Sequence, residues 1–167
     1  MAVILIIILG LFFGFLAKIS DIYFYVEYLG MSLSDMTSEM GIWILIGVII
    51  SLYSKNKKRA MINIFLFSIS MLFSYYLTAE LTNSIYGYSF IKFWSIFSLL
   101  TTIFAYIVCL TKEKNKRSFF IKLAIIISYI LIDIIIYGGP RIYDILFVTI
   151  LIRLLFFRKD KKLGSNR

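Results

Sequence analysis

The chain has 167 residues, of which 61% are hydrophobic and 16% are charged, and it carries a formal net charge of +9 at pH 7. An average soluble domain is about 45–50% apolar and about 25% charged, so this composition excludes an ordinary soluble fold and indicates membrane-spanning helices. The sequence has no histidine and one cysteine, Cys109, which excludes His-dependent catalysis, an internal disulfide and a zinc site. We therefore expect neither a metal nor a cofactor.

Six apolar runs follow one another along the chain, and each is predicted to be a membrane-spanning helix. The first run lacks a basic leading region and a small-x-small cleavage pattern, so we expect a retained helix rather than a signal peptide. About 20 helical residues cross a bilayer, and the first, second and sixth runs are expected to extend into flanking residues. Continuous rather than alternating runs argue against transmembrane strands. The runs cover residues 2–17, 40–54, 60–79, 93–111, 118–137 and 142–157.

Lysine and arginine divide the connections between these runs into two kinds. Basic residues fill Lys55–Arg59, Lys112–Arg117 and the tail from Arg158, whereas the long connection 18–39 is acidic. Basic loops stay in the cytoplasm, so the sequence predicts an all-α, polytopic, six-transmembrane-helix bundle with both termini inside. The whole chain, 1–167, is expected to form this single membrane domain. Topology and anionic headgroups explain the basic clusters, so membrane lipid is the expected partner and nucleic acid is not.

The first run carries small residues on one face, with Gly10, Gly14 and Ala17 at spacings of four and three. Lipid provides no hydrophobic drive between helices, so small residues mark places where helices approach closely. Two interpretations stay open: this face packs inside the bundle, or it binds a transmembrane partner subunit. The connection Lys18–Glu39 mixes tyrosines with acids, and we expect it to lie on the outer interface or to fold over a site as a lid.

The fifth and sixth runs enclose charged residues in the segment YILIDIIIYGGPRIYDILF, Tyr129–Phe147. A carboxylate at the bilayer centre costs about 2.5–3.5 kcal/mol on insertion scales, so Asp133 needs a partner even near the outer end of its helix. Gly138 or Gly139 is expected to end the fifth helix in the left-handed conformation, and Pro140 suits the first turn of the next helix. The two helices should therefore be antiparallel neighbours.

Two interpretations of these charges stay open. In the first, Arg141 neutralises Asp133 and Asp144 in a clasp that holds two helices together. In the second, the same side chains face an outward pocket that binds a polar or cationic solute between aromatic walls, which further include Tyr75, Tyr86 and Tyr88. The candidate ligand-binding residues are Tyr76, Glu80, Trp94, Tyr129, Asp133, Tyr137, Arg141 and Asp144.

Six spans, the Gly10–Gly14–Ala17 face and the long Lys18–Glu39 connection together resemble the S subunits of energy-coupling factor transporters. The resemblance implies a solute-binding transport subunit that takes a vitamin or similar solute near the outer face, under a lid, and docks on a membrane partner through its first helix. The segment Arg59–Leu81 looks like parts of small membrane proteins of Gram-positive bacteria, which implies a bacterial cytoplasmic membrane.

The alternative function is a non-catalytic interaction, regulatory or immunity protein that acts through helix–helix contacts in the membrane. Its surface would be the Gly10–Gly14–Ala17 face, and the charged group in the fifth and sixth runs would be purely structural. No Ser–His, Cys–His or paired-acid motif of recognised spacing is present, so we do not expect an enzyme.

Overall fold

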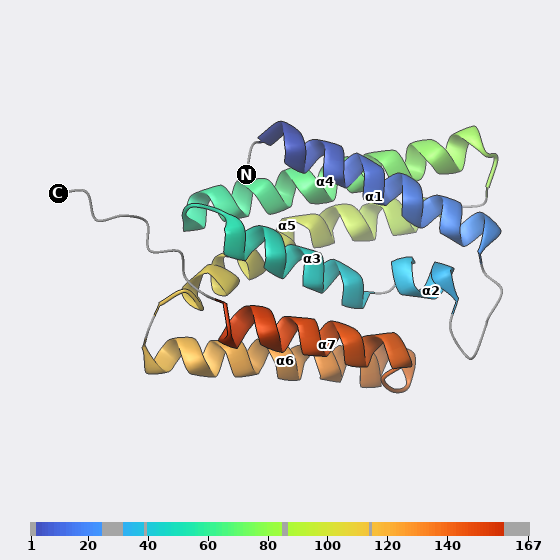
Figure 1. Cartoon of the computed structure of the whole chain (residues 1–167). Helices are drawn as coiled ribbons and strands as arrows, with labels where there is room; N and C mark the ends of the chain where they lie inside the picture. The colour runs from blue at the N-terminus through green and yellow to red at the C-terminus, as the bar shows by residue number, and fades with distance from the viewer. Residues whose placement is uncertain (1–2, 25–31, 39, 85–86, 114, 159–167) are drawn as a thin grey trace.

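Seven helices make up the part of the chain that the computed structural model describes, which is residues 3–24, 32–38, 40–84, 87–113 and 115–158. Within these ranges no residue is in a strand, so the all-α prediction is confirmed. The helices are α1 (Val3–Tyr23), α2 (Leu33–Ser38), α3 (Met40–Tyr53), α4 (Lys57–Leu81), α5 (Tyr88–Leu110), α6 (Lys116–Tyr137) and α7 (Ile142–Phe156), as Figure 1 shows.

Five stretches of the described chain are long and apolar enough to cross a membrane. They are α1, α4, most of α5, most of α6 and the stretch Ser34–Tyr53, which runs from the second residue of α2 to the end of α3. The remaining helix, α7, is apolar but has only 15 residues, fewer than the roughly 20 that span a bilayer without help from flanking residues. Large aliphatic and aromatic side chains are exposed around the bundle, which suits a lipid environment better than water.

The helices begin and end within a few residues of the predicted runs, and the largest difference is at the end of α1. The first apolar run ends at Ala17 and was expected to extend into flanking residues, and α1 continues to Tyr23. In this extension the ammonium group of Lys18 lies 5.0 Å from the centre of the Tyr75 ring. The fold therefore supplies a partner to the first charged residue beyond the apolar run.

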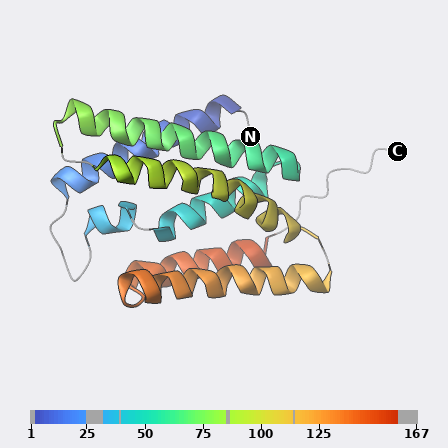
Figure 2. The same cartoon turned by 180° about the vertical axis from the view of Figure 1, so that it is seen from behind.

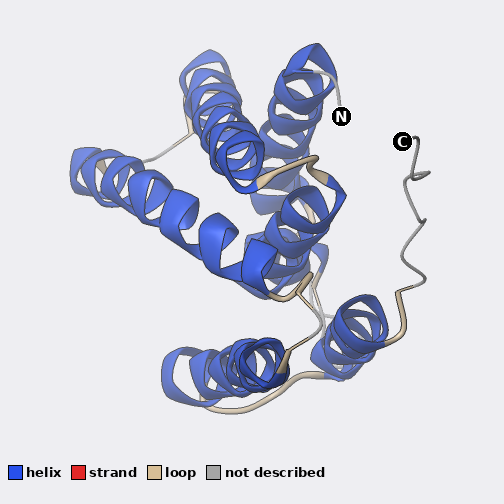
Figure 3. Cartoon of the chain, turned by 90° about the vertical axis from the view of Figure 1, so that its left-hand side faces the viewer, coloured by secondary structure: helices blue, strands red, loops and turns tan. Residues whose placement is uncertain are grey.

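The bundle consists of two groups of helices joined by α3. On one side α1 packs along α4, which also packs against α5; on the other side α6 and α7 form an antiparallel hairpin. The hairpin lies below the other helices in the end-on view of Figure 3, and from behind, α5 lies between α4 and α6 (Figure 2). Two apolar cores result, and α3 contributes to both, with Leu45 and Val48 in one and Ile50 in the other.

Small residues allow α1 and α4 to approach closely. A Cβ atom at Gly10 would lie 2.6 Å from the carbonyl oxygen of Phe67, and one at Gly14 would lie closer still to that of Met71. Ala17, which completes this face, is buried as well. The face that we considered for a partner subunit is therefore covered by α4 of the same chain, which is the internal packing that the spacing equally predicted.

The two ends of the bundle differ in charge. At one end, on the right of Figure 1, lie the end of α1, α2 and the turn between α6 and α7, with Asp21, Asp35 and Asp144; we name it the acidic end. At the other, basic end lie the α3–α4 and α5–α6 connections, the start of α1 and the end of α7. The basic connections that the sequence placed on one side of the membrane thus share one end of the molecule.

Candidate functional site at the acidic end

The turn between α6 and α7 brings the charged residues of the hairpin together. Gly138 ends α6 in the left-handed conformation, with φ of 79°, as the sequence predicted, and Gly139 follows at φ of 149°. The backbone N–H groups of both glycines donate to the carbonyl oxygen of Asp133. Arg141 is then the N-cap residue of α7, in extended conformation, so Asp144 lies in the first turn of that helix, where a carboxylate is favourable.

The carboxylate of Asp144 joins the two helices of the hairpin. Its Oδ2 accepts a 2.7 Å hydrogen bond from the backbone N–H of Arg141, and its Oδ1 accepts one of 2.8 Å from the hydroxyl of Tyr129 on α6. Tyr129 is 1% exposed and Asp144 is 3% exposed. The start of α3 covers the pair so closely that a Cβ at Gly41 would overlap the Tyr129 hydroxyl. The hairpin thus packs against the start of α3 at Gly41.

The guanidinium group of Arg141 contacts two residues that the predicted clasp did not include. Its Nη1 lies 3.2 Å from Oδ2 of Asp35 on α2 and donates a 2.9 Å hydrogen bond to the hydroxyl of Tyr143. The two side chains of the Arg141–Asp35 ion pair are 32% and 35% exposed. Asp133 is buried on α6, 2% exposed, and takes part in an interaction in the fold. Asp35 therefore joins the group, although sequence reasoning did not include it among the candidate site residues.

A second polar cluster joins α1 to α4 at the same end. The hydroxyl of Tyr75 donates a 2.5 Å hydrogen bond to Oδ2 of Asp21, and the hydroxyl of Ser34 donates one of 3.0 Å to Oδ1. Lys18 lies over the Tyr75 ring and is only 5% exposed. The sequence carried a signal for this cluster, because Asp21 follows Ala17 by four residues and so lies on the α1 face that meets α4.

The short helix α2 links these two clusters, because two adjacent residues of it point in different directions. Ser34 binds Asp21 of α1, and Asp35 binds Arg141 at the hairpin turn. The helix is itself fixed by a cap, in which the hydroxyl of Ser32 accepts a 2.9 Å hydrogen bond from the backbone N–H of Asp35. We name Ser34 and Asp35, with their partners, the α2 bridge; it ties the α1–α4 pair to the α6–α7 hairpin.

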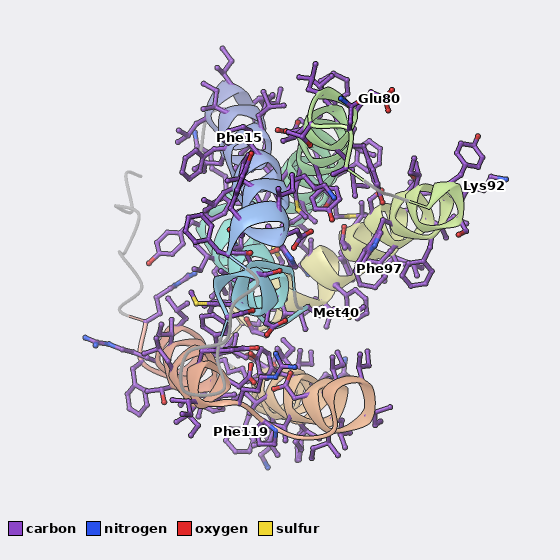
Figure 4. All side chains as sticks on the ribbon, turned by 90° about the vertical axis from the view of Figure 1, so that its right-hand side faces the viewer. Phe15, Met40, Glu80, Lys92, Phe97 and Phe119 are labelled. Atoms are coloured by element: carbon purple, nitrogen blue, oxygen red, sulfur yellow. The ribbon has the colours of Figure 1, made fainter. Side chains whose placement is uncertain are left out.

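The other predicted pocket residues do not join this group in the described contacts. Glu80 is exposed near the end of α4, apart from the hairpin in the view of Figure 4. Trp94 contacts the rings of Phe93 and Phe97 on its own helix, at 5.3 and 5.5 Å. The ring of Tyr76 lies 5.2 Å from that of Tyr75.

Several expectations fall on parts of the chain that the structure does not describe. The central part of the expected lid, residues 25–31, lies outside the described residues, as do Tyr86 and the side chain of Tyr137. The lid and these two aromatic walls therefore stay predictions. Among the residues that are described, no three His, Cys, Asp or Glu side chains lie where they could hold a metal ion.

Comparison of the chain with protein-family models, with curated proteins and with solved structures finds no match. The resemblance to transporter S subunits therefore stays a prediction, and function has to be argued from geometry. Two hollows are described, and both lie at the basic end, away from the candidate pocket residues.

Proposed function

We propose that the chain is an integral membrane protein with six spans and both termini in the cytoplasm, acting as a non-catalytic interaction protein in a bacterial cytoplasmic membrane. The five long apolar helices support the membrane location. The short α7 is the sixth span in this proposal, and Arg153 reaches the interface from its last turn by snorkelling. The basic connections all meet one end of the bundle, which the positive-inside rule places in the cytoplasm.

The observation that carries the interaction role is that carboxylates at the acidic end accept hydrogen bonds from other groups of the same chain. Asp144 binds Tyr129 and the Arg141 backbone, and Asp21 binds Tyr75 and Ser34. A solute site needs polar groups that converge on an empty space, whereas these groups converge on helix contacts. Their role in this proposal is to fix the arrangement of the helices, and the activity resides in contacts made with other membrane components.

Single introduced cysteines test the topology. In a Cys109→Ala background, Thr82→Cys lies exposed at the acidic end and Lys116→Cys lies exposed at the basic end. A membrane-impermeant thiol reagent added to intact cells should label the first variant and should label the second only after lysis. Labelling of Lys116→Cys in intact cells, with Thr82→Cys protected, would reverse the proposed orientation.

Purification in a mild detergent tests the interaction role. We expect the tagged chain to retain a second membrane protein, and we expect its melting temperature to stay constant across a panel of vitamins and metabolites. The matched control is an unrelated six-span protein of similar net charge, purified in the same way. Recovery of the chain alone, together with strong stabilisation by one solute, would contradict the proposal.

The exposed part of the acidic end favours solute binding as a second candidate. The Arg141–Asp35 pair is about one third exposed, so a charged solute could replace one member of the pair without unfolding the hairpin. In that case a stabilising solute should lose its effect in Arg141→Gln and in Asp35→Asn. The same solute should still stabilise Glu80→Gln, since Glu80 lies at the end of α4, apart from the hairpin.

A further inference from the structure

The basic end contains a hollow of about 800 Å³ between the α5–α6 connection, the end of α3 and the end of α7. Four of its lining residues are cationic, and Glu113 is the acidic one. The Glu113 carboxylate is already occupied, since it accepts hydrogen bonds from Lys57 at 3.1 Å and from Asn115 at 3.0 Å. The lining is therefore strongly positive. Its cationic members are Lys112, Lys116, Lys122 and Arg158.

Two of the cations are held in place by the end of α3. The ammonium group of Lys112 donates a 2.7 Å hydrogen bond to the carbonyl oxygen of Ser54, and Nη1 of Arg158 donates one of 2.7 Å to that of Leu52. Cations are favourable at the C-terminal end of a helix, so both positions are fixed by the fold. Burial lowers the pKa of Lys112, and an anion in the hollow would favour its charged form.

The other two cations lie along α6 at different depths. Lys116 is the first residue of the helix, and Lys122 follows six residues later, about 9 Å further along the axis. The described contact of the Lys122 ammonium group is the ring of Phe156, 5.4 Å away. A cation this far inside a membrane helix is costly unless an anion or a cavity accompanies it.

The lining also has polar residues, Thr111, Asn115 and Ser118, and an apolar part formed by α6 and α7. Leu154, Leu155 and Phe156 of α7 contribute to the hollow, and so does Phe119 of α6. Phe119 packs edge-on against Phe156 at 5.9 Å and is 53% exposed. The hollow therefore opens where hydrocarbon would meet the protein, with its charges beside its apolar side chains. Cationic and apolar side chains thus lie side by side, as a ligand with both a phosphate and acyl chains requires.

From this geometry we infer that the hollow binds one anionic phospholipid of the leaflet that meets the basic end. Lys116 and Lys122 bind the phosphate and the remaining headgroup, the fixed Lys112 and Arg158 supply the positive field, and the acyl chains follow Phe119 and the α7 leucines. Basic pockets between membrane helices are suited to such headgroups. The inference goes beyond the proposed function and holds for either orientation of the chain.

Lipid titration of the purified full-length protein tests the inference, with bound lipid counted by native mass spectrometry. Phosphatidylglycerol should bind at a single site, phosphatidylcholine should bind much more weakly, and glycerol phosphate without acyl chains should not compete. In Lys116→Gln/Lys122→Gln, phosphatidylglycerol should bind about tenfold more weakly or worse at low salt. The control Arg59→Gln/Arg117→Gln removes the same charge at the same end from exposed residues that do not line the hollow.

Each alternative outcome overturns a stated part of the inference. Equal weakening in the two double variants would mean diffuse charge attraction and no site. Competition by glycerol phosphate as strong as by the intact lipid would identify a site for a soluble phosphate compound. Equal binding of phosphatidylcholine would remove the role of the cations. Melting curves of both double variants without lipid separate a loss of binding from a folding defect. A Lys122→Arg variant keeps the charge and should bind phosphatidylglycerol as the unchanged protein does.

Discussion

The charged residues at the two ends of the bundle differ in their surroundings. At the acidic end, Asp21, Asp144 and Arg141 bind partners from other helices, and the carboxylate of Asp144 is buried. At the basic end, cations outnumber carboxylates and surround open hollows. Charged groups that bind other helices fix helix positions, whereas cations around an open space are available to a ligand. The acidic end therefore holds the helices together, and the basic end is where a ligand can bind.

The largest expected effect concerns the α1–α4 contact, which positions Asp21 for the acidic end. Gly14→Ala should destabilise the protein by about 1–3 kcal/mol or more, because the new Cβ meets the backbone of Met71 and the helices must separate. Thermal unfolding in detergent measures the change. Gly47→Ala is the matched control, since its Cβ would lie 3.8 Å from Ile64 Cδ1, an ordinary contact; alanine should be tolerated there, as a better helix former. Similar melting temperatures for the two variants would contradict the packing argument.

The hydrogen bond between Tyr129 and Asp144 should give the next largest effect. Tyr129→Phe removes the hydroxyl that donates to Asp144 and leaves one oxygen of a buried carboxylate without that donor, which costs about 1–3 kcal/mol. Tyr88→Phe, at an exposed tyrosine, should leave the melting temperature unchanged. A double-mutant cycle with Asp144→Asn isolates the pair, because the loss from Tyr129→Phe should shrink once the carboxylate is absent. Additive losses would show that the two groups do not act together.

The α2 bridge should contribute less, because its ion pair is partly open to water. Asp35→Asn should cost at most about 1 kcal/mol at low salt, and less at high salt, as is usual for exposed pairs. Hydrogen exchange should detect it more clearly, since weakening the bridge should speed exchange at α2 and at the α6–α7 turn. Exchange that changes at α2 alone would mean that the helix does not couple the two groups of helices.

Sequence reasoning predicted the helices and the glycine that ends α6, because both depend on local signals, but Pro140 precedes the N-cap residue Arg141 instead of lying in the first turn of α7. Apolar runs define membrane helices by length, and Gly138 ends α6 in the conformation that its position required. The partners of the charges were harder to predict. Arg141 lies three residues from Asp144, yet its guanidinium group reaches Asp35, more than a hundred residues earlier in the chain. Such a pairing depends on where α2 lies in space, and periodicity in one helix carries no information on that.

At the basic end, too, the sequence does not show which residues come together in space. The positive-inside rule explains why lysines gather in these connections, but it does not tell which of them line a hollow. That distinction appears only when the α5–α6 connection, the end of α3 and the end of α7 are brought together around one hollow. Lys116 lines it while the adjacent Arg117 does not, although the two are equivalent in a count of charges.

The smallest expected effect is at the Lys57–Glu113 ion pair of the basic end. Hydrogen bonds from Lys57 and Asn115 hold the pKa of Glu113 below its ordinary value of about 4.3. A lowered carboxyl pKa contributes stability above the ordinary value and loses it as the pH falls through the lowered one. Glu113→Gln should therefore change the melting temperature very little at neutral pH, because the pair is exposed, and should remove even that small difference in acid. A large loss at neutral pH would show that this end is held together by its ion pair. The contrast between a structural acidic end and an open basic end would then fail.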